Sequence, residues 1–220
     1  MSLADGAAPA ADLPKDRIRD AATIILIDRD RADGPAVLMG MRGSAAAFMP
    51  SKYVFPGGAV DPGDAATPCP DALSDTCRAR LAVEPLTGVG ADALARAALR
   101  EMVEETGLSV SPSADDPLLF VFRAITPPGR PRRFDARFFL IDARNITGDP
   151  NDFSAACDEL SHLHWVPLAQ ARELDLPFIT EVVLAEVAAL VARTQGPLAQ
   201  PETVPFFDNR GDEPRFVQLS

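Results

Sequence analysis

The sequence is poor in the residues that build disulfide frameworks and zinc sites. It has only three cysteines and two histidines in 220 residues. Cys69, Cys77 and Cys157 have neither zinc-site spacing nor the even number of a closed disulfide framework, so we interpret them as reduced thiols. His162 and His164 lie two residues apart, without a third suitably spaced ligand. We therefore expect a structural role for both histidines.

Positive charge and long apolar runs are also scarce. The chain has 21 Lys and Arg against 32 Asp and Glu, a formal net charge of −11. Such a balance argues against a broad basic surface for nucleic acid or anionic membranes. The longest apolar stretches are far shorter than the roughly 20 residues that cross a bilayer, and the start lacks the pattern of a secretory signal. We expect a cytoplasmic protein that binds neither nucleic acid nor membranes.

The order of the expected elements indicates a single α/β domain. Segments rich in β-branched residues predict strands, and segments rich in Ala, Leu, Arg and Glu predict helices. Strands are expected at 22–28, 36–42, 53–55, 118–125, 134–141 and 162–166, and helices at 92–106, 168–173 and 178–193. This order predicts a mixed sheet sandwiched between helices.

The boundaries of the domain follow from changes in composition. Residues 1–20, rich in Ala, Asp and Pro, are expected to form a flexible arm, and residues 21–195 the domain itself. Residues 196–220 show little periodicity and predict an extended tail. This tail is expected to lie on the domain or on a second subunit, which makes it a candidate for holding a homodimer.

The expected helix 92–106 carries an unusual group of carboxylates. At about 100° per residue, Glu101, Glu104 and Glu105 share one arc of this helix. The opposite, core-facing side is expected to hold Ala95, Leu99, Met102 and Val103. Carboxylates crowded near a helix C-terminus repel one another and are disfavoured by the helix dipole, so they invite a cation such as Mg²⁺. Arg100 can orient or partly neutralise Glu104, and a solvated acidic face is the alternative interpretation.

The full string around these carboxylates favours the metal site. Residues 100–108 read REMVEETGL, and residues 55–58 read FPGG. The first string resembles the second half of the Nudix signature, G-x5-E-x7-R-E-U-x-E-E-x-G-U, where U is a bulky aliphatic residue. The second string resembles the strand end and Gly-Gly turn that open the signature. The chain thus resembles the Nudix hydrolases, which implies an α/β/α sandwich with a central mixed β-sheet.

The spacing between the two halves of the signature departs from the family pattern. Asp64 stands at the right interval after Gly58, but residues 65–99, which number 35, separate it from Arg100, where the signature has seven. Asp92 stands at the right interval before Arg100, but Leu86 then occupies the position of the glycine. An insertion at about 65–91 therefore interrupts the box, and a short helix is expected within it at 71–81. The first acidic position stays open between the two aspartates.

The resemblance implies metal-dependent hydrolysis of a diphosphate linkage in a small nucleotide-like molecule. Glu101, Glu104 and Glu105 would hold Mg²⁺, or alternatively Mn²⁺, and Glu101 could instead accept a proton from the attacking water. The main-chain carbonyl of Gly57 would be a further ligand, and Glu159 is a candidate ligand from a loop beyond the box. The bound cations would neutralise the diphosphate and lower the pKa of a water molecule.

Two segments bear on the choice of substrate. Residues 38–42 (LMGMR) and 132–140 (RRFDARFFL) resemble a branch of coenzyme A diphosphatases, which also has an interrupted box. Arginine forks suit phosphate groups, and the candidates are Arg42, Arg132, Arg133 and Arg137. Internal pairing of these arginines is the alternative, because strand alternation places Arg133, Asp135 and Arg137 on one face.

The expected substrate is therefore coenzyme A or acyl-coenzyme A. ADP-ribose, a dinucleotide or a nucleotide sugar is the alternative within the same reaction class. A non-catalytic regulator that binds a nucleotide is a further alternative, and the complete set of carboxylates argues against it.

Overall fold

The computed structural model describes residues 17–44, 46, 49–66, 69–111, 114, 117–211 and 213–220. The strands in this part of the chain are β1 (Ile18–Asp28), β2 (Ala36–Arg42), β3 (Tyr53–Val54), β4 (Gly57–Ala59), β5 (Leu119–Ile125), β6 (Arg133–Asp142), β7 (Leu160–Pro167), β8 (Val204–Asp208) and β9 (Arg215–Leu219). The α-helices are α1 (Asp75–Leu81), α2 (Ala91–Thr106) and α3 (Phe178–Arg193).

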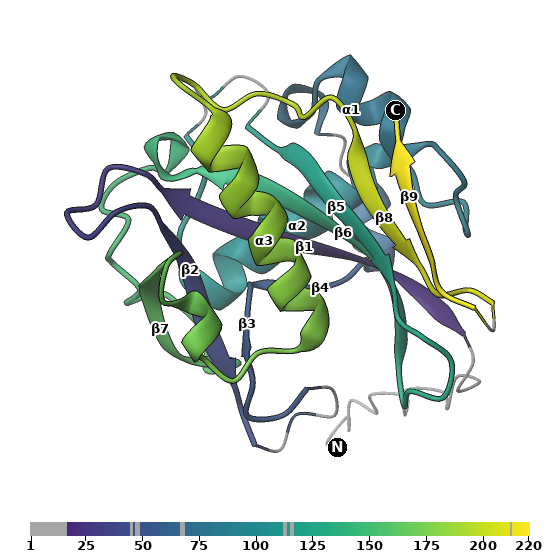
Figure 1. Ribbon diagram of the computed structural model, residues 1–220, viewed down its shortest axis with the longest axis horizontal. Helices are drawn as coiled ribbons and strands as arrows, with labels where there is room; N and C mark the ends of the chain where they lie inside the picture. Colours follow the sequence, from purple (N-terminus) through teal and green to yellow (C-terminus); the bar gives the residue numbers. More distant parts are fainter. Residues whose placement is uncertain are drawn as a thin grey trace, which may run out of the picture.

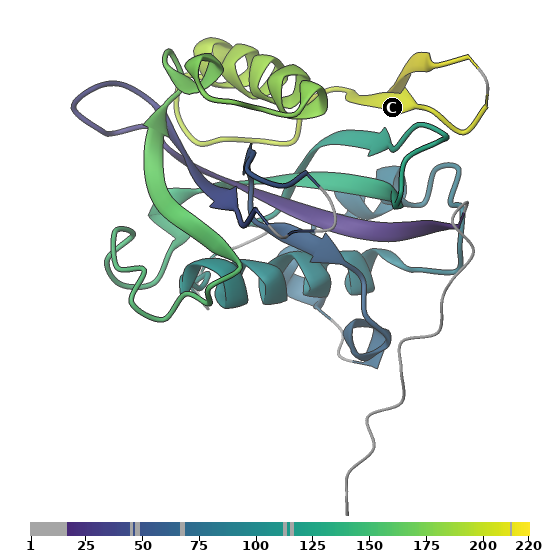
Figure 2. The same cartoon turned by 90° about the horizontal axis from the view of Figure 1, so that it is seen from below.

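The strands form one mixed sheet in the order β3-β2-β1-β6-β5-β8-β9, and β4 and β7 pair with β1 and β2, respectively (Figure 1). The pairs β1–β6 and β5–β8 are parallel, whereas the other pairs are antiparallel. Helix α3 covers one face of the sheet and α2 the other (Figure 2). The predicted α/β/α sandwich around a mixed sheet is confirmed.

Both faces of the central strands are buried, because each is covered by a helical layer. Ile24 and Leu26 of β1 belong to the core beneath α2, whereas Ile25 and Ile27 belong to the core beneath α3. Successive side chains of a strand point to opposite faces, so a strand covered on both sides is a continuous apolar run. Burial of this apolar surface, worth about 25 cal/mol per Å², is the main force that holds the layers together.

Most of the expected elements are present close to their expected positions. The helix expected at 178–193 is α3, and the helix expected at 92–106 is α2. Helix α2 ends at Gly107, whose φ of 74° is left-handed and whose N–H donates to the carbonyl of Val103. The short helix expected in the insertion is α1, preceded by a 3-10 turn. The helix expected at 168–173 is only a 3-10 turn over Ala171–Glu173, because the backbone becomes extended again at Leu174.

The structure corrects the predicted boundaries at both ends of the domain. β1 begins at Ile18 and the Asp20 side chain is buried, so residues 18–20 belong to the sheet, and residues 1–16 of the predicted arm lie outside the described residues. The predicted extended tail forms β8 and β9 instead. β8 pairs with β5 and fully buries Phe206, so this segment is an integral part of the sheet.

A group of buried charges connects the insertion to the sheet, and we call it the buried ion network. It consists of Asp20 on β1, Arg123 on β5, and Asp135 and Arg137 on β6, each with a side chain only 1–3% exposed. Asp135 accepts from both arginines, with N···O distances of 2.7 Å to Arg123 and 3.1 Å to Arg137. Arg137 also lies 2.5 Å from Asp20, and Arg123 donates to the carbonyls of residues 83 and 84 in the insertion. Every member of the network therefore has a partner of opposite charge.

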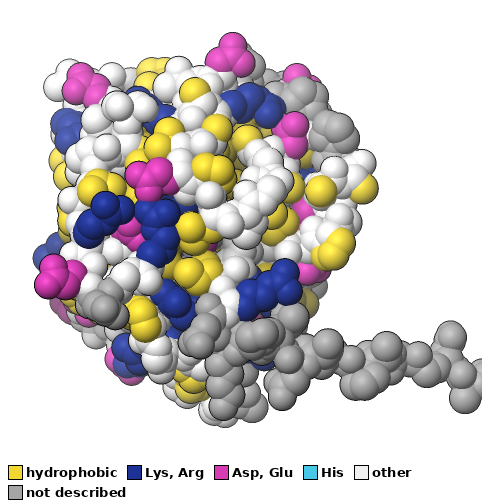
Figure 3. Space-filling model, turned by 90° about the vertical axis from the view of Figure 1, so that its right-hand side faces the viewer, with side chains coloured by type: hydrophobic (Ala, Val, Ile, Leu, Met, Phe, Trp, Pro, Cys, Tyr) yellow, Lys and Arg dark blue, Asp and Glu magenta, His cyan; other side chains and the backbone are white. Residues whose placement is uncertain are grey.

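The surface of the described part of the chain carries charges of both signs. On the face shown in Figure 3, Lys and Arg side chains are interspersed with Asp and Glu. Asp208 pairs with both Arg210 and Arg215. None of the described helices is long and apolar enough to span a membrane. Cys69, Cys77 and Cys157 are free thiols.

Candidate active site

The site forms where the Gly-Gly turn at β4 packs against α2. Gly57 has a φ of 154°, and a Cβ atom there would lie 2.6 Å from the carbonyl oxygen of Ala22. A Cβ atom on Gly58 would lie 2.2 Å from Oε1 of Glu101. The absence of both side chains therefore lets the turn approach β1 and leaves space for a carboxylate. The two halves of the motif, separated by the insertion in sequence, lie together in space.

Glu105 is the most deeply buried carboxylate of the site. Its side chain is 2% exposed, and its Oε2 accepts a hydrogen bond of 2.7 Å from the N–H of Gly57. Its Oε1 is also buried and has no hydrogen-bond partner. Burial raises the pKa of Glu105 to about 8, and the nearby charges of Glu159 and Glu101 act in the same direction. An unsatisfied buried carboxylate oxygen is costly, so a cation beside it would be stabilised.

This burial corrects the predicted faces of α2. Val103, expected in the core, is 46% exposed, whereas Met102 and Glu105 are both buried. Helix α2 packs against both β1 and β4, so the stripe that faces the glycines of β4 is covered as well. Glu105 therefore lies on the covered side of the helix. A division of α2 into an apolar face and an opposite, solvated acidic face does not hold at this residue.

Arg100 links the helix to the loop after the Gly-Gly turn. Its Nε and Nη2 atoms each lie 3.0 Å from a carboxylate oxygen of Asp64, and its Nη1 lies 2.8 Å from Glu101 and 3.2 Å from Glu104. Nη2 also donates to the carbonyl of Ala59. Burial opposes the charge of Asp64, but the hydrogen bonds from Arg100 and from the N–H of Asp61 lower its pKa overall.

The two candidates for the first acidic position now differ. Asp64 is 3% exposed and forms a two-pronged ion pair with Arg100. Asp92 lies in the first turn of α2 and pairs with Arg78 at 2.7 Å. The geometry therefore favours Asp64, with the insertion following it. The carbonyl of Ala59 is a partner of Arg100 that no sequence motif indicated.

Arg42 and Glu159 reach the site from β2 and from the loop before β7. Nη2 of Arg42 lies 3.2 Å from Oε1 of Glu159 and 3.9 Å from Oε1 of Glu105. The loop is attached to the end of α2, because the N–H of Cys157 donates to the carbonyl of Glu104 at 2.8 Å. The structure thus brings two residues singled out in the sequence next to the carboxylates of the helix. The attachment at Cys157 had no signal in the sequence.

The other candidate arginines have partners elsewhere. Arg137 belongs to the buried ion network, and Arg133 is buried and donates to the carbonyls of Thr126 and Asn209. The guanidinium groups of these two residues are satisfied within the fold, which favours internal pairing, and their role in substrate binding stays a prediction. Arg132 is exposed in the turn between β5 and β6. In the described part of the chain, no hydrogen bond or ion pair links Arg132 to the carboxylates of the site.

Two arginine side chains of the site each lie between two carboxylates. Arg100 lies between Glu101 and Glu104, and Arg42 lies between Glu105 and Glu159. Within the described ranges, no three His, Cys, Asp or Glu side chains converge in a geometry that could hold a metal ion. The donors nevertheless suit a hard cation, because they are all oxygen atoms and one of them is buried without a partner. The carbonyl of Gly57 as a metal ligand stays a prediction.

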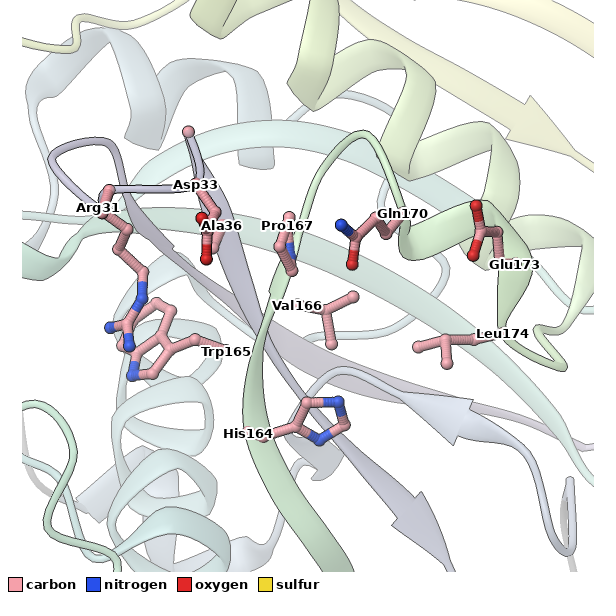
Figure 4. A pocket seen from close by; sticks show the side chains of 12 residues that line it. Arg31, Asp33, Ala36, His164, Trp165, Val166, Pro167, Gln170, Glu173 and Leu174 are labelled. Carbon is pink, nitrogen blue, oxygen red and sulfur yellow. The ribbon is translucent and has the colours of Figure 1, made fainter.

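A separate cavity of about 520 Å³ lies beside β7, at the end of the β2–β7 pair remote from Arg42 (Figure 4). Its lining includes Arg31, Asp33, His164 and Gln170. None of the carboxylates of the site contributes to it. The candidate active site and this cavity are therefore distinct.

Comparisons with known proteins were made by family, by sequence and by structure. No family model matches the chain. It is 28% identical over 180 residues to the Caenorhabditis elegans protein "Putative nudix hydrolase 7", covering 67% of this chain and 51% of that protein. The chain thus spans about half the length of the curated relative it matches.

Two solved structures resemble the fold. A NUDIX hydrolase from Alicyclobacillus acidocaldarius is 26% identical, with a TM-score of 0.56, covering 83% of this chain and 98% of that chain. A C. elegans Ap4A hydrolase in a binary complex is 16% identical, with a TM-score of 0.50, covering 80% and 100%. The second likeness shows the fold alone.

The sandwich, the Gly-Gly turn and the glutamate helix resemble the fold and motif of Nudix hydrolases. The curated relative and the Alicyclobacillus acidocaldarius structure show that this chain is similar to Nudix hydrolases in sequence and in fold. Neither comparison distinguishes the coenzyme A branch from the rest of that family.

Proposed function

We propose that this chain is a metal-dependent hydrolase that cleaves the diphosphate linkage of a nucleoside diphosphate derivative. The observation that carries the proposal is the buried carboxylate of Glu105, one oxygen of which has no partner. Glu101 is directed to the same turn, where only a glycine at position 58 leaves room for it. A purely structural ion pair would satisfy such an oxygen within the fold, and a solvated acidic face would not bury it.

The donor set fits Mg²⁺ or Mn²⁺. Glu101, Glu104 and Glu105 would hold the ion, with the Gly57 carbonyl and Glu159 as further ligands. When bound, such an ion neutralises the diphosphate and lowers the pKa of the attacking water. Burial raises the pKa of Glu101, which makes its carboxylate a stronger base and supports it as the acceptor of the proton of that water.

Two arginines have different roles in this proposal. Arg100 positions the carboxylates, because it is held by both oxygens of Asp64 while it contacts Glu101. Arg42 is partly exposed at the edge of the site and carries a guanidinium fork suited to phosphate oxygens. We assign Arg42 to the binding of the substrate diphosphate.

The finer substrate proposal is coenzyme A or acyl-coenzyme A. Its support is the interrupted box and the segment 38–42, which places Arg42 in the site. The buried Arg133 and Arg137 no longer support it, so its basis is narrower than the sequence indicated. ADP-ribose, a dinucleotide and a nucleotide sugar are the rival substrates. A cytoplasmic location and a homodimer remain predictions from the sequence.

A panel of diphosphates tests the reaction class and the substrate together. Purified protein with Mg²⁺ is given coenzyme A, acetyl-coenzyme A, ADP-ribose, a dinucleoside polyphosphate and a nucleotide sugar, and the products are separated by chromatography. With coenzyme A we expect adenosine 3′,5′-bisphosphate and a phosphopantetheine product. Binding of these compounds without turnover would favour the non-catalytic regulator, and preferred turnover of ADP-ribose would exclude the finer proposal.

The variant Glu104→Gln tests the metal assignment. We expect kcat/KM to fall by roughly 10³-fold or more while the circular dichroism spectrum stays unchanged, because the exposed side chain makes little contribution to the core. Glu181→Gln on α3 is the matched control, since it removes the same charge from an exposed helix position. Near-normal turnover by Glu104→Gln would contradict the assignment.

A further inference from the structure

Arg42 stands against a buried carboxylate oxygen of the site that lacks a hydrogen-bond partner. Its Nη2 atom lies 3.9 Å from Oε1 of Glu105. This distance is an ion pair but exceeds that of a hydrogen bond, so the guanidinium compensates the charge of Glu105 without satisfying its oxygen. The same nitrogen lies 3.2 Å from Glu159. One cation therefore neutralises two carboxylates that the proposed function assigns to a metal ion.

The backbone of Arg42 is held by hydrogen bonds to its neighbours, whereas its side chain is held by carboxylates of the site. Its N–H donates to the carbonyl of Lys52, and its own carbonyl accepts from Ser51. Its side-chain contacts in the described part of the chain are the ion pairs with Glu105 and Glu159. Arg100 differs, since Asp64 and the carbonyl of Ala59 hold it in addition to the glutamates.

We propose that Arg42 and the divalent cation compete for Glu105 and Glu159, so that metal binding releases the Arg42 guanidinium to the substrate phosphates. A divalent ion on these carboxylates and a guanidinium less than 4 Å from them would repel each other. Metal binding is therefore expected to weaken the contacts of Arg42. This inference rests on the proposed function, because it concerns the metal and the diphosphate of that site.

The exchange has a thermodynamic consequence for the substrate. A guanidinium that has lost its carboxylates favours a new anionic partner, and the phosphates of the substrate provide one. Metal and substrate should then bind with positive coupling, and the coupling must be reciprocal. Arg42 would weaken metal binding to the free enzyme and strengthen substrate binding to the metal-loaded enzyme.

Metal titration of the full chain without substrate tests the competition directly. Mn²⁺ binding is measured by calorimetry for the wild type, Arg42→Gln and Arg42→Lys. Removal of the competing charge should make Mn²⁺ bind roughly tenfold more tightly to Arg42→Gln, about 1.4 kcal/mol. Arg42→Lys keeps the charge and should stay within about twofold of the wild type. Arg42→Met is the second charge-removing variant if Arg42→Gln melts at a lower temperature.

Arg144→Gln is the matched control for net charge. It removes one positive charge from an exposed ion pair with Asp30, outside the site, and should leave the Mn²⁺ affinity within about twofold of the wild type. An equal gain in affinity for Arg144→Gln and Arg42→Gln would overturn the competition, because it would show a general charge effect. Unchanged or weaker Mn²⁺ binding by folded Arg42→Gln and Arg42→Met would also overturn it.

A second titration measures the coupling, with ADP as the probe. ADP should increase the Mn²⁺ affinity of the wild type more than that of Arg42→Gln, by roughly fivefold or more. Equal increases in the two proteins would contradict the release of Arg42 to phosphate. If the wild type binds no Mn²⁺ at all, the proposed function itself fails. Wild-type binding that Arg42 variants do not alter removes only the competition.

Discussion

The buried ion network and the Glu105 carboxyl group are both removed from water, yet their partners differ. In the network, Asp135 accepts from Arg123 and Arg137 at 2.7–3.1 Å. In the site, Glu105 has one hydrogen bond, from Gly57, and its second oxygen has none. Charges that satisfy one another within the fold hold the structure together, whereas a buried charge left unsatisfied is suited to an external ligand.

The comparison also assigns a structural role to part of the insertion. The carbonyls of Val83 and Glu84 accept from Arg123, and the hydroxyl of Thr87 donates to Asp20 at 2.5 Å. The insertion therefore completes the shell of the network. The same segment follows Asp64, which holds Arg100 in the site. The insertion thus interrupts the motif in sequence but leaves the glutamate helix in place. Its own residues support the buried ion network of the sheet.

Breaking the network should produce the largest change in stability. Asp135→Asn leaves Arg123 and Arg137 buried without their shared carboxylate, and we expect the free energy of unfolding to fall by about 3–5 kcal/mol in urea denaturation. Asp30→Asn is the control, since Asp30 is 62% exposed in its pair with Arg144, and it should cost less than about 1 kcal/mol. Equal effects of the two variants would show that burial does not set the energy of the network.

Replacing the buried Glu105 by glutamine should have the opposite effect and increase the free energy of unfolding at high pH. The pKa of Glu105 is raised from its ordinary 4.5 to about 8 in the folded chain. A carboxyl with a raised pKa stabilises the fold fully below pH 4.5, and this contribution is lost as the pH rises to about 8. Without metal, Glu105→Gln should therefore be more stable than the wild type at pH 8.5, by on the order of a few kcal/mol, and the difference should shrink at pH 4.5.

Urea denaturation in EDTA at the two pH values measures this difference. Addition of Mg²⁺ at pH 8.5 should stabilise the wild type and leave Glu105→Gln nearly unchanged, because only the wild type keeps the charged ligand. A pH-independent difference between the two proteins would contradict the raised pKa.

The smallest expected effect separates the two aspartates. Asp64→Asn loosens the two-pronged contact that positions Arg100 and, through it, Glu101, so kcat should fall by roughly tenfold with little change in KM. Asp92→Asn disrupts a partly exposed ion pair with Arg78 and should leave kcat within about twofold. Steady-state kinetics on the best substrate of the panel decides, and the reverse ranking would assign the first acidic position to Asp92.

The sequence predicts where helices and strands form better than it predicts which of their faces are buried. Helix α3 and the end of α2 at Gly107 follow from periodicity and glycine chemistry, which act over a few residues. β8 was missed because it is short, contains Pro205 and pairs with β5, about 80 positions earlier in the chain. Alternation placed Arg133 and Arg137 on one face of β6, but no local pattern states that this face is buried. For the same reason, the exposed Val103 was misplaced.

The candidate site shows the same division. The sequence identifies the carboxylates of the site, because the glutamates, the glycines and Arg100 form a motif. The sequence does not predict the burial of these carboxylates. The burial arises where β4 packs against α2, and an insertion separates these two elements in the sequence. Asp64 could be named only as one of two alternatives, and the three-dimensional contact with Arg100 favours it.

The central position of β1 has a consequence for how the chain folds. β1 lies inside the sheet, and its buried Asp20 is paired with Arg137, 117 positions later. At about 5–20 residues per second, a ribosome needs roughly 6–23 s to make the chain between them. The first strand of the sheet is therefore synthesised long before the strand that satisfies it. Such distant pairings slow folding and leave the apolar edges of β1 uncovered until β6 has been made, so this strand is open to non-native contacts during synthesis.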